Sequence, residues 1–150
     1  PLYSSAASDV YKRQENNTGK NAIIEYKQNQ RDDHSNWCYA SLEDVKENIN
    51  NLKSSSKINF IKGDIIETLK NDNNIPDAIS VLRLDTDWYE STKKELEILY
   101  PKLSVGGVLI IDDYGHWGGC KKAVDEYFEK NGNKPLLIPS DYTGRISIKV

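Results

Sequence analysis

The sequence of 150 residues has no methionine, only two cysteines and no long apolar run. No stretch approaches the ~20 apolar residues that a membrane-spanning helix needs, so no such helix is expected. Acidic residues outnumber basic ones and give a net charge of −3, which argues against a nucleic-acid-binding protein. Cys38 and Cys120 lack the spacing of a metal or redox motif, so we expect two small buried side chains in a reduced, cytoplasmic protein.

The first residues carry little structural information. Residues 1–14 show no periodicity, and residues 9–14 (DVYKRQ) resemble the translation of a sequencing adapter. We expect this segment to be an artefact or a disordered arm, and we exclude it from the fold. Residues 15–37 are polar and predict a loop or a loose helix. Residues 15–150 are then expected to form the C-terminal part of one domain.

Helical and extended patterns alternate along the remaining chain and predict an α/β layer sandwich. Ser41, with Asp44 three residues later, has the pattern of a helix start. The apolar stripe of that helix is expected to consist of Leu42, Val45, Ile49 and Leu52. Further helices are expected at residues 65–69, at 89–103 with an end near Pro101, and from about 120 to 131. Strands are expected at residues 58–62, 78–84, 108–111, 135–139 and 146–150.

Two short apolar runs are the most informative segments of the chain, because each is followed directly by carboxylate residues. Residues 81–84 lead into Asp85, and residues 108–111 lead into Asp112 and Asp113. Such runs are typical of parallel strands buried on both faces, which predicts a three-layer sandwich. Ligands bind at the carboxyl ends of parallel strands, so these aspartates should share one rim of the sheet.

Asp85, Asp112 and Asp113 are the candidate metal ligands. Mg²⁺ prefers carboxylate oxygens and keeps open positions for substrate oxygens. A metal there would orient a bound hydroxyl and lower its pKa. The alternative is that Asp112 and Asp113 cap the next segment while Asp85 bonds within a turn.

Asp87 and His116 are the candidate proton acceptors near this rim. The imidazole of a histidine titrates close to neutral pH, although a lone loop histidine is often merely solvated. Asp87 could equally cap the helix that begins near Tyr89.

Gly63 and Asp64 end an earlier predicted strand at the same side of the sheet. The glycine would let a ligand approach the backbone, and the aspartate could accept a hydrogen bond from a purine or a ribose. They could also form a plain turn between strand and helix. One or two aromatic residues near these rims are expected to stack on a sugar or purine ring. The candidates are Trp37, Trp88, Tyr89, Tyr114 and Trp117.

Five segments together resemble the macrocin O-methyltransferase family over about residues 37–150. They are LRLDTDWYEST (82–92), LYPKL (99–103), GGV (106–108), IIDDYG (110–115) and AVDEYF (123–128). The resemblance implies a Rossmann-like class I methyltransferase fold that uses S-adenosylmethionine and Mg²⁺. Members of this family typically methylate hydroxyls on sugars of natural products, so a small hydroxylated acceptor is implied, and a homo-oligomer is left open.

Position by position, the resemblance makes Asp85, Asp112 and Asp113 the metal ligands. It places Gly63 and Asp64 at the adenine end of the cofactor and Asp85 beside it. Related catechol-type enzymes have a lysine base shortly after the first metal aspartate, and residues 86–89 contain none. The base is therefore left open between His116 and Asp87.

The resemblance also implies two cofactor-binding features that this sequence lacks. The glycine-rich cofactor loop and the acidic ribose-binding residue of this fold should precede residue 15, and neither is recognisable. We therefore expect the chain to begin at the third strand of the sheet, with the N-terminal part of the sheet missing, and to be inactive on its own. Two alternatives are a haloacid dehalogenase-type phosphatase, which Tyr89 disfavours, and a non-catalytic module that binds a metal with a sugar or nucleotide.

Overall fold

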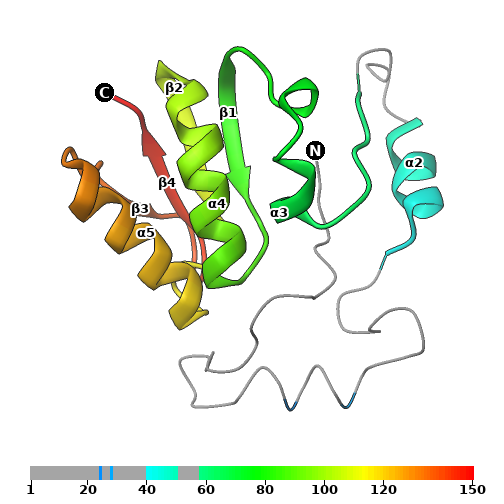
Figure 1. The fold of residues 1–150 in the computed structure, drawn as a ribbon. Helices are drawn as coiled ribbons and strands as arrows, with labels where there is room; N and C mark the ends of the chain where they lie inside the picture. The colour runs from blue at the N-terminus through cyan, green and yellow to red at the C-terminus, as the bar shows by residue number, and fades with distance from the viewer. Residues whose placement is uncertain (1–23, 25–27, 29–39, 51–57) are drawn as a thin grey trace.

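The core of the chain is a four-stranded mixed sheet covered by two helices (Figure 1). This computed structural model describes residues 24, 28, 40–50 and 58–150. The strand order is β1-β2-β4-β3, in which β1 (Ile79–Leu84) and β2 (Leu103–Ile111) are parallel. Strand β4 (Arg145–Ile148) is antiparallel to both β2 and β3 (Ile138–Pro139). The predicted α/β fold class is confirmed.

Helices α4 (Tyr89–Leu99) and α5 (Gly118–Asn131) pack on the same face of the sheet (Figure 1). The side chains buried between the helices and the sheet include Leu82, Leu84, Leu96, Leu109, Ile111, Val124 and Phe128. The opposite face of the sheet is open, since Val81 and Ile148 are 59% and 58% exposed. Of the three layers that the sequence predicts, the part of the chain with a described structure forms two.

Leu96 is the side chain on α4 that the core encloses most completely. It is fully buried, whereas Leu136 is 78% exposed. Replacing Leu96 with alanine should lower the free energy of unfolding by about 2–5 kcal/mol, because the cavity cannot close fully. Leu136→Ala should change it by less than about 0.5 kcal/mol. Urea denaturation of the two variants tests this, and equal losses would contradict the packing described here.

The predicted helix start at Ser41 is confirmed. The Asp44 N–H donates to Ser41 Oγ at 3.1 Å, and the Ser41 N–H donates to Asp44 Oδ2 at 3.2 Å. This reciprocal pair begins α2 (Leu42–Asn50), because it satisfies amide groups that have no partner within the helix. Leu42, Val45 and Ile49 are its half-buried positions. Leu52, the last residue predicted for this stripe, lies outside the described residues.

The strand predicted at residues 58–62 is wrong. The segment runs as an extended trace apart from the sheet (Figure 1) and pairs with no described residue. Alternating apolar residues favour an extended backbone, but a strand also requires a hydrogen-bonded neighbour. Helix α3 (Ile65–Thr68) follows, close to its predicted position.

The junction between α4 and β2 differs from the prediction. A 3₁₀ turn (Tyr100–Lys102) follows α4, and Leu103 already belongs to the strand. Gly106 and Gly107 lie within β2, at an irregularity where the register against β1 shifts between Ile79 and Val81. Gly106 has a φ of +81° there, which glycine adopts without strain.

The remaining elements follow the predictions with shorter strands. Helix α5 ends at the predicted Asn131, and Gly132 after it has a φ of +68°. Strands β3 and β4 cover only parts of the two predicted C-terminal strands. Ile24 and Gln28 are helical and exposed, but the rest of the predicted N-terminal loop lies outside the described residues. None of the described helices has the length and apolar character to cross a membrane.

Candidate functional site: a carboxylate cluster at the sheet rim

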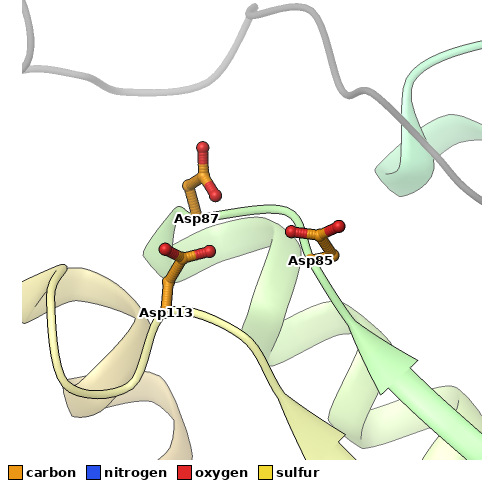
Figure 2. Close-up of side chains that lie close together, drawn as sticks. All are labelled: Asp85, Asp87 and Asp113. Atoms are coloured by element: carbon orange, nitrogen blue, oxygen red, sulfur yellow. The ribbon is translucent and has the colours of Figure 1, made fainter. Parts of the chain in front are cut away.

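Three aspartates meet where β1 and β2 end (Figure 2). Leu84 pairs with Ile111, so the two parallel strands end at the same level of the sheet. The Asp112 N–H still donates to the Leu84 carbonyl at 2.9 Å, which keeps the two ends together. Carboxylate oxygens of Asp85, Asp87 and Asp113 lie within 4.8 Å of one another. The predicted shared rim is confirmed.

The turn after β1 directs two of these side chains to the same side. Asp85 and Asp87 flank Thr86 in this turn, and both contribute a carboxylate oxygen to the cluster. Asp87 has a φ of +63°, and the Trp88 N–H donates across it to the Thr86 carbonyl at 2.7 Å. This tight three-residue turn is uncommon for a residue other than glycine. Asp87 is not the N-cap of α4, because Trp88 takes that position.

Burial and mutual repulsion raise the pKa values of the cluster. Burial raises the pKa of Asp113 to about 8, with further contributions from its hydrogen bond to Asp87 and from the Asp87 charge. Burial also raises the pKa of Asp87. The pKa of Asp85 is raised by burial and then by the neighbouring Asp112 charge. Such a cluster holds protons near neutral pH unless a cation takes their place.

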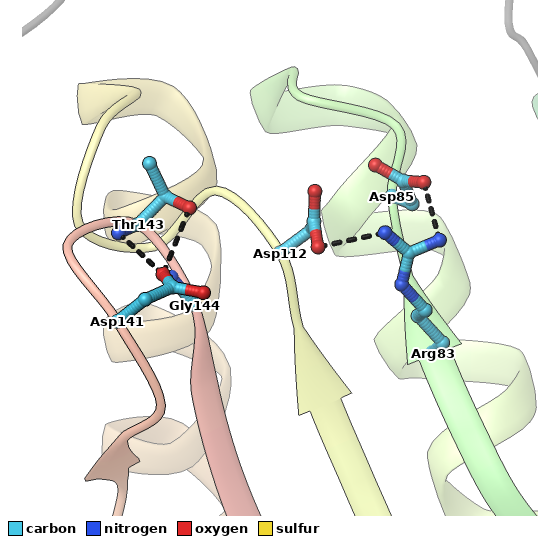
Figure 3. Close-up of polar contacts among 6 residues, drawn as sticks. All are labelled: Arg83, Asp85, Asp112, Asp141, Thr143 and Gly144. Atoms are coloured by element: carbon cyan, nitrogen blue, oxygen red, sulfur yellow. Dashed lines mark hydrogen bonds and ion pairs between the residues drawn. The ribbon is translucent and has the colours of Figure 1, made fainter.

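Arg83 provides one positive charge beside the cluster (Figure 3). Its Nη1 lies 2.6 Å from Asp85 Oδ2, and its Nη2 lies 2.7 Å from Asp112 Oδ1. Sequence reasoning missed this residue, although its position two before Asp85 on one strand puts both side chains on the same face. Arg83 thereby joins the carboxylates of Asp85 and Asp112.

The donor set fits a hard divalent cation. Opposite ligands of an octahedral Mg²⁺ with bonds of 2.0–2.1 Å lie about 4.2 Å apart, slightly closer than the 4.8 Å limit of this cluster. Small side-chain rotations would suffice to bring three oxygens to that spacing. The structure brings Asp85 and Asp113 together as expected. It places Asp87, rather than the expected Asp112, as the third oxygen of the tightest group.

His116 lies behind Asp113 in the loop that leads to α5. The backbone N–H groups of His116 and Trp117 donate to the Asp113 carbonyl at 3.0 and 2.9 Å. His116 Nδ1 is buried and has no hydrogen-bond partner among the described residues. Its ring stands edge-on to Trp117 and Tyr142, with centroids 4.7 and 5.9 Å away. The imidazole charge would lower the pKa of Asp113.

A second loop closes tightly on the His116 loop. The Gly115 N–H donates to the Thr143 carbonyl at 2.8 Å. A Cβ at Gly115 would stand 2.1 Å from the Tyr142 carbonyl oxygen, so no larger residue fits. Asp141 Oδ1 accepts the Thr143 and Gly144 N–H groups at 2.8 and 2.7 Å and fixes this second loop (Figure 3).

The other predicted site residues have structural contacts. Asp64 caps α3, and its Oδ1 accepts the Ile66 N–H at 2.8 Å. Gly63 has a φ of +146°, which suits glycine at this turn. Their predicted contact with a cofactor stays a prediction.

The described aromatic residues near the rim are engaged in packing or hydrogen bonds. Trp88 and Trp117 are buried against each other, with ring centroids 5.3 Å apart. The hydroxyl of Tyr89 donates to Glu126 at 2.5 Å, and that of Tyr114 donates to Asp125 at 2.8 Å. Trp37 lies outside the described residues.

Comparison with known proteins gives consistent matches. A family model described as Macrocin-O-methyltransferase (TylF) matches residues 16–146. Demethyldecarbamoylnovobiocin O-methyltransferase of Streptomyces niveus is 42% identical over 106 residues, which are 69% of this chain and 39% of that protein. An 8-demethyl-8-(2,3-dimethoxy-alpha-L-rhamnosyl)-tetracenomycin-C 4'-O-methyltransferase of Streptomyces olivaceus is 35% identical over 117 residues, covering 75% of this chain and 42% of that protein.

The fold is also similar to a solved structure. The structure of the O-methyltransferase NovP matches with a TM-score of 0.65 and 38% identity over 73% of this chain and 45% of that chain. The chain spans about two fifths of the length of the curated relatives it matches.

Proposed function

Because the chain belongs to the macrocin O-methyltransferase family, we propose that the whole protein transfers a methyl group from S-adenosylmethionine to a hydroxyl of a sugar or glycosylated natural product. The named relatives are O-methyltransferases of demethyldecarbamoylnovobiocin and of a rhamnosyl tetracenomycin. The observation that carries the proposal is the carboxylate cluster at the rim of a sheet similar to that of NovP. Family membership leaves no support for a phosphatase.

We propose that the transfer depends on Mg²⁺ held by Asp85, Asp112 and Asp113. A bound divalent cation lowers the pKa of a coordinated hydroxyl and fixes its orientation. Arg83 pairs with both Asp85 and Asp112, and the carboxylate of Asp85 also lies near that of Asp113. To bind a cation through Asp112, Arg83 would release at least one of its two partners.

Asp87 is the proton acceptor that we propose first. It lies against Asp113, and burial raises its pKa above the ordinary value of a carboxyl group, which makes its carboxylate a stronger base. His116 is the second candidate, since Nδ1 is buried without a partner among the described residues. Contacts of Gly63, Asp64 and Asp85 with S-adenosylmethionine, the cytoplasmic location and a possible homo-oligomer stay predictions.

A methyl-transfer assay with the whole protein tests this function. Demethyldecarbamoylnovobiocin serves as the acceptor, S-adenosylmethionine with a labelled methyl group serves as the donor, and each reaction is run with and without EDTA. We expect turnover to fall at least about 100-fold in EDTA and to return with added MgCl₂, because the aspartates alone cannot activate the hydroxyl.

Two results would contradict the proposal in different ways. Undiminished turnover after chelation would remove the metal from the mechanism and leave the methyl transfer intact. Binding of S-adenosylhomocysteine without turnover of any glycoside in a panel would instead favour the non-catalytic binding module.

A further inference from the structure

Thr86 lies between the two carboxylates of the turn and points the opposite way. Its neighbours Asp85 and Asp87 reach the rim (Figure 2), whereas Thr86 is 4% exposed and faces helix α4, which carries its hydrogen-bond partner. The Thr86 hydroxyl donates to Glu95 Oε2 at 2.7 Å. Glu95 is itself 3% exposed, so this hydrogen bond lies inside the core.

The backbone of Thr86 is also held, both within the turn and from α4. Its carbonyl accepts the Trp88 N–H at 2.7 Å and the Ser91 hydroxyl at 3.1 Å. Both bonds constrain the turn in which Asp87 has a φ of +63°. A backbone of this kind persists only where surrounding contacts over-determine it. Side-chain and backbone contacts of Thr86 together supply that constraint.

Packing alone does not explain a carboxyl group at position 95. Burying a polar side chain is unfavourable unless its hydrogen bonds repay the lost hydration, and an apolar side chain of similar size packs at least as well. A glutamate here therefore points to a requirement that leucine would not meet. The contact it makes is with the residue that joins Asp85 to Asp87.

We propose that Glu95 is a positioning residue that fixes Thr86 and thereby sets the positions of the Asp85 and Asp87 carboxylates. This inference rests on the proposed function, because it assigns the turn a role in holding the cation and accepting the proton. Glu95 acts through Thr86 and touches neither cation nor acceptor. Groups that orient metal ligands in this way typically change metal affinity 10- to 100-fold when they are replaced.

Two substitutions at Glu95 separate positioning from packing. Glu95→Gln keeps the shape and a hydrogen-bonding group for Thr86, whereas Glu95→Leu keeps approximate volume and removes the hydrogen bond. Ser147→Ala is the control, since Ser147 is buried and its hydroxyl has no partner among the described residues. All variants are made in the whole protein.

Hydrogen exchange of the Trp88 amide, which closes the turn, provides a readout that needs neither metal nor turnover. In Glu95→Leu this amide should exchange at least about tenfold faster. The Asp112 amide, bonded between β1 and β2, should keep its wild-type rate. Glu95→Gln and Ser147→Ala should resemble the wild type at both amides. Titration with Mn²⁺ should show affinity about 10- to 100-fold weaker in Glu95→Leu only.

The possible failures are distinguishable. If Glu95→Leu leaves the Trp88 amide unchanged, or speeds both amides equally, the positioning role is wrong. If the wild type binds no Mn²⁺, the metal part of the proposed function fails, and the Trp88 amide still decides whether Glu95 holds the turn. If Glu95→Leu does not fold, Thr86→Val removes the same hydrogen bond from the other partner and must give the same local exchange.

Discussion

Replacing Asp113 with asparagine is expected to lower methyl transfer by the whole protein about 10³-fold. Asp113 belongs to the tightest group of carboxylates and lies against Asp87, so its charge is central to holding a cation. An amide removes that charge while keeping the size of the side chain. Loss of one preorganised charge-stabilising group in an active site commonly lowers the rate 10²–10³-fold, and loss of a metal ligand should lie at the upper end.

The same substitution should leave the fold intact. Burial already disfavours the ionised form of Asp113, so an uncharged amide should be tolerated as well as the carboxyl group. Asp72→Asn is the matched control, because Asp72 is exposed and lies in a 3₁₀ turn that is not part of the cluster. Assays of turnover and thermal unfolding on both variants test this. Wild-type turnover in Asp113→Asn would exclude the proposed metal role of Asp113, and loss of folding would make the cluster structural.

The free energy of unfolding in the absence of divalent cations should fall as the pH rises from about 5 to 9. Burial raises the pKa of Glu95 from 4.5 to about 8. The folded state then binds more protons than the unfolded state between these values, so the derivative of unfolding free energy with pH is negative. The stabilising contribution is complete below pH 4.5 and is lost as the pH passes 8. A shift of this size corresponds to a loss on the order of 5 kcal/mol.

Urea denaturation at several pH values in EDTA measures this effect. Glu95→Leu should remove most of the slope, since it has no group to ionise at that position. Asp113, whose pKa is also raised to about 8, should contribute a smaller residual slope because it is partly solvated. Asp125 behaves oppositely: Lys121, Lys134 and Tyr114 hold its pKa at about 2, so its contribution is lost only in strong acid. A wild-type stability that is constant from pH 5 to 9 would contradict the buried position of Glu95.

The parts of the fold with strong local signals could be predicted from the sequence. The apolar runs before Asp85 and Asp112 specify adjacent strands, and their abrupt ends specify the rim. The Ser41–Asp44 pair specifies the start of α2 because both hydrogen bonds are local. Gly132 similarly specifies the end of α5 through its positive φ. Each of these features depends on residues close together in the chain.

Features that depend on distant partners could not be predicted in the same way. The segment at 58–62 has the composition of a strand, but pairing depends on a neighbour that its own residues do not define. The approach of Asp87 to Asp85 and Asp113 depends on the turn after β1, and the ion pairs of Arg83 with Asp85 and Asp112 join the ends of two strands. The pKa of Glu95 is raised because this side chain of α4 is buried against the turn after β1. No local sequence pattern reveals that burial.

The close contact between Gly115 and Tyr142 couples the positions of two loops. One loop follows β2 and the other precedes β4, and the bond from Gly115 to Thr143 joins them where no Cβ fits. An insertion in either loop would strain this contact, so a change in the length of one loop requires the other loop to move with it. The two loops are therefore expected to shift as one unit, so a substitution that moves one of them also moves the other.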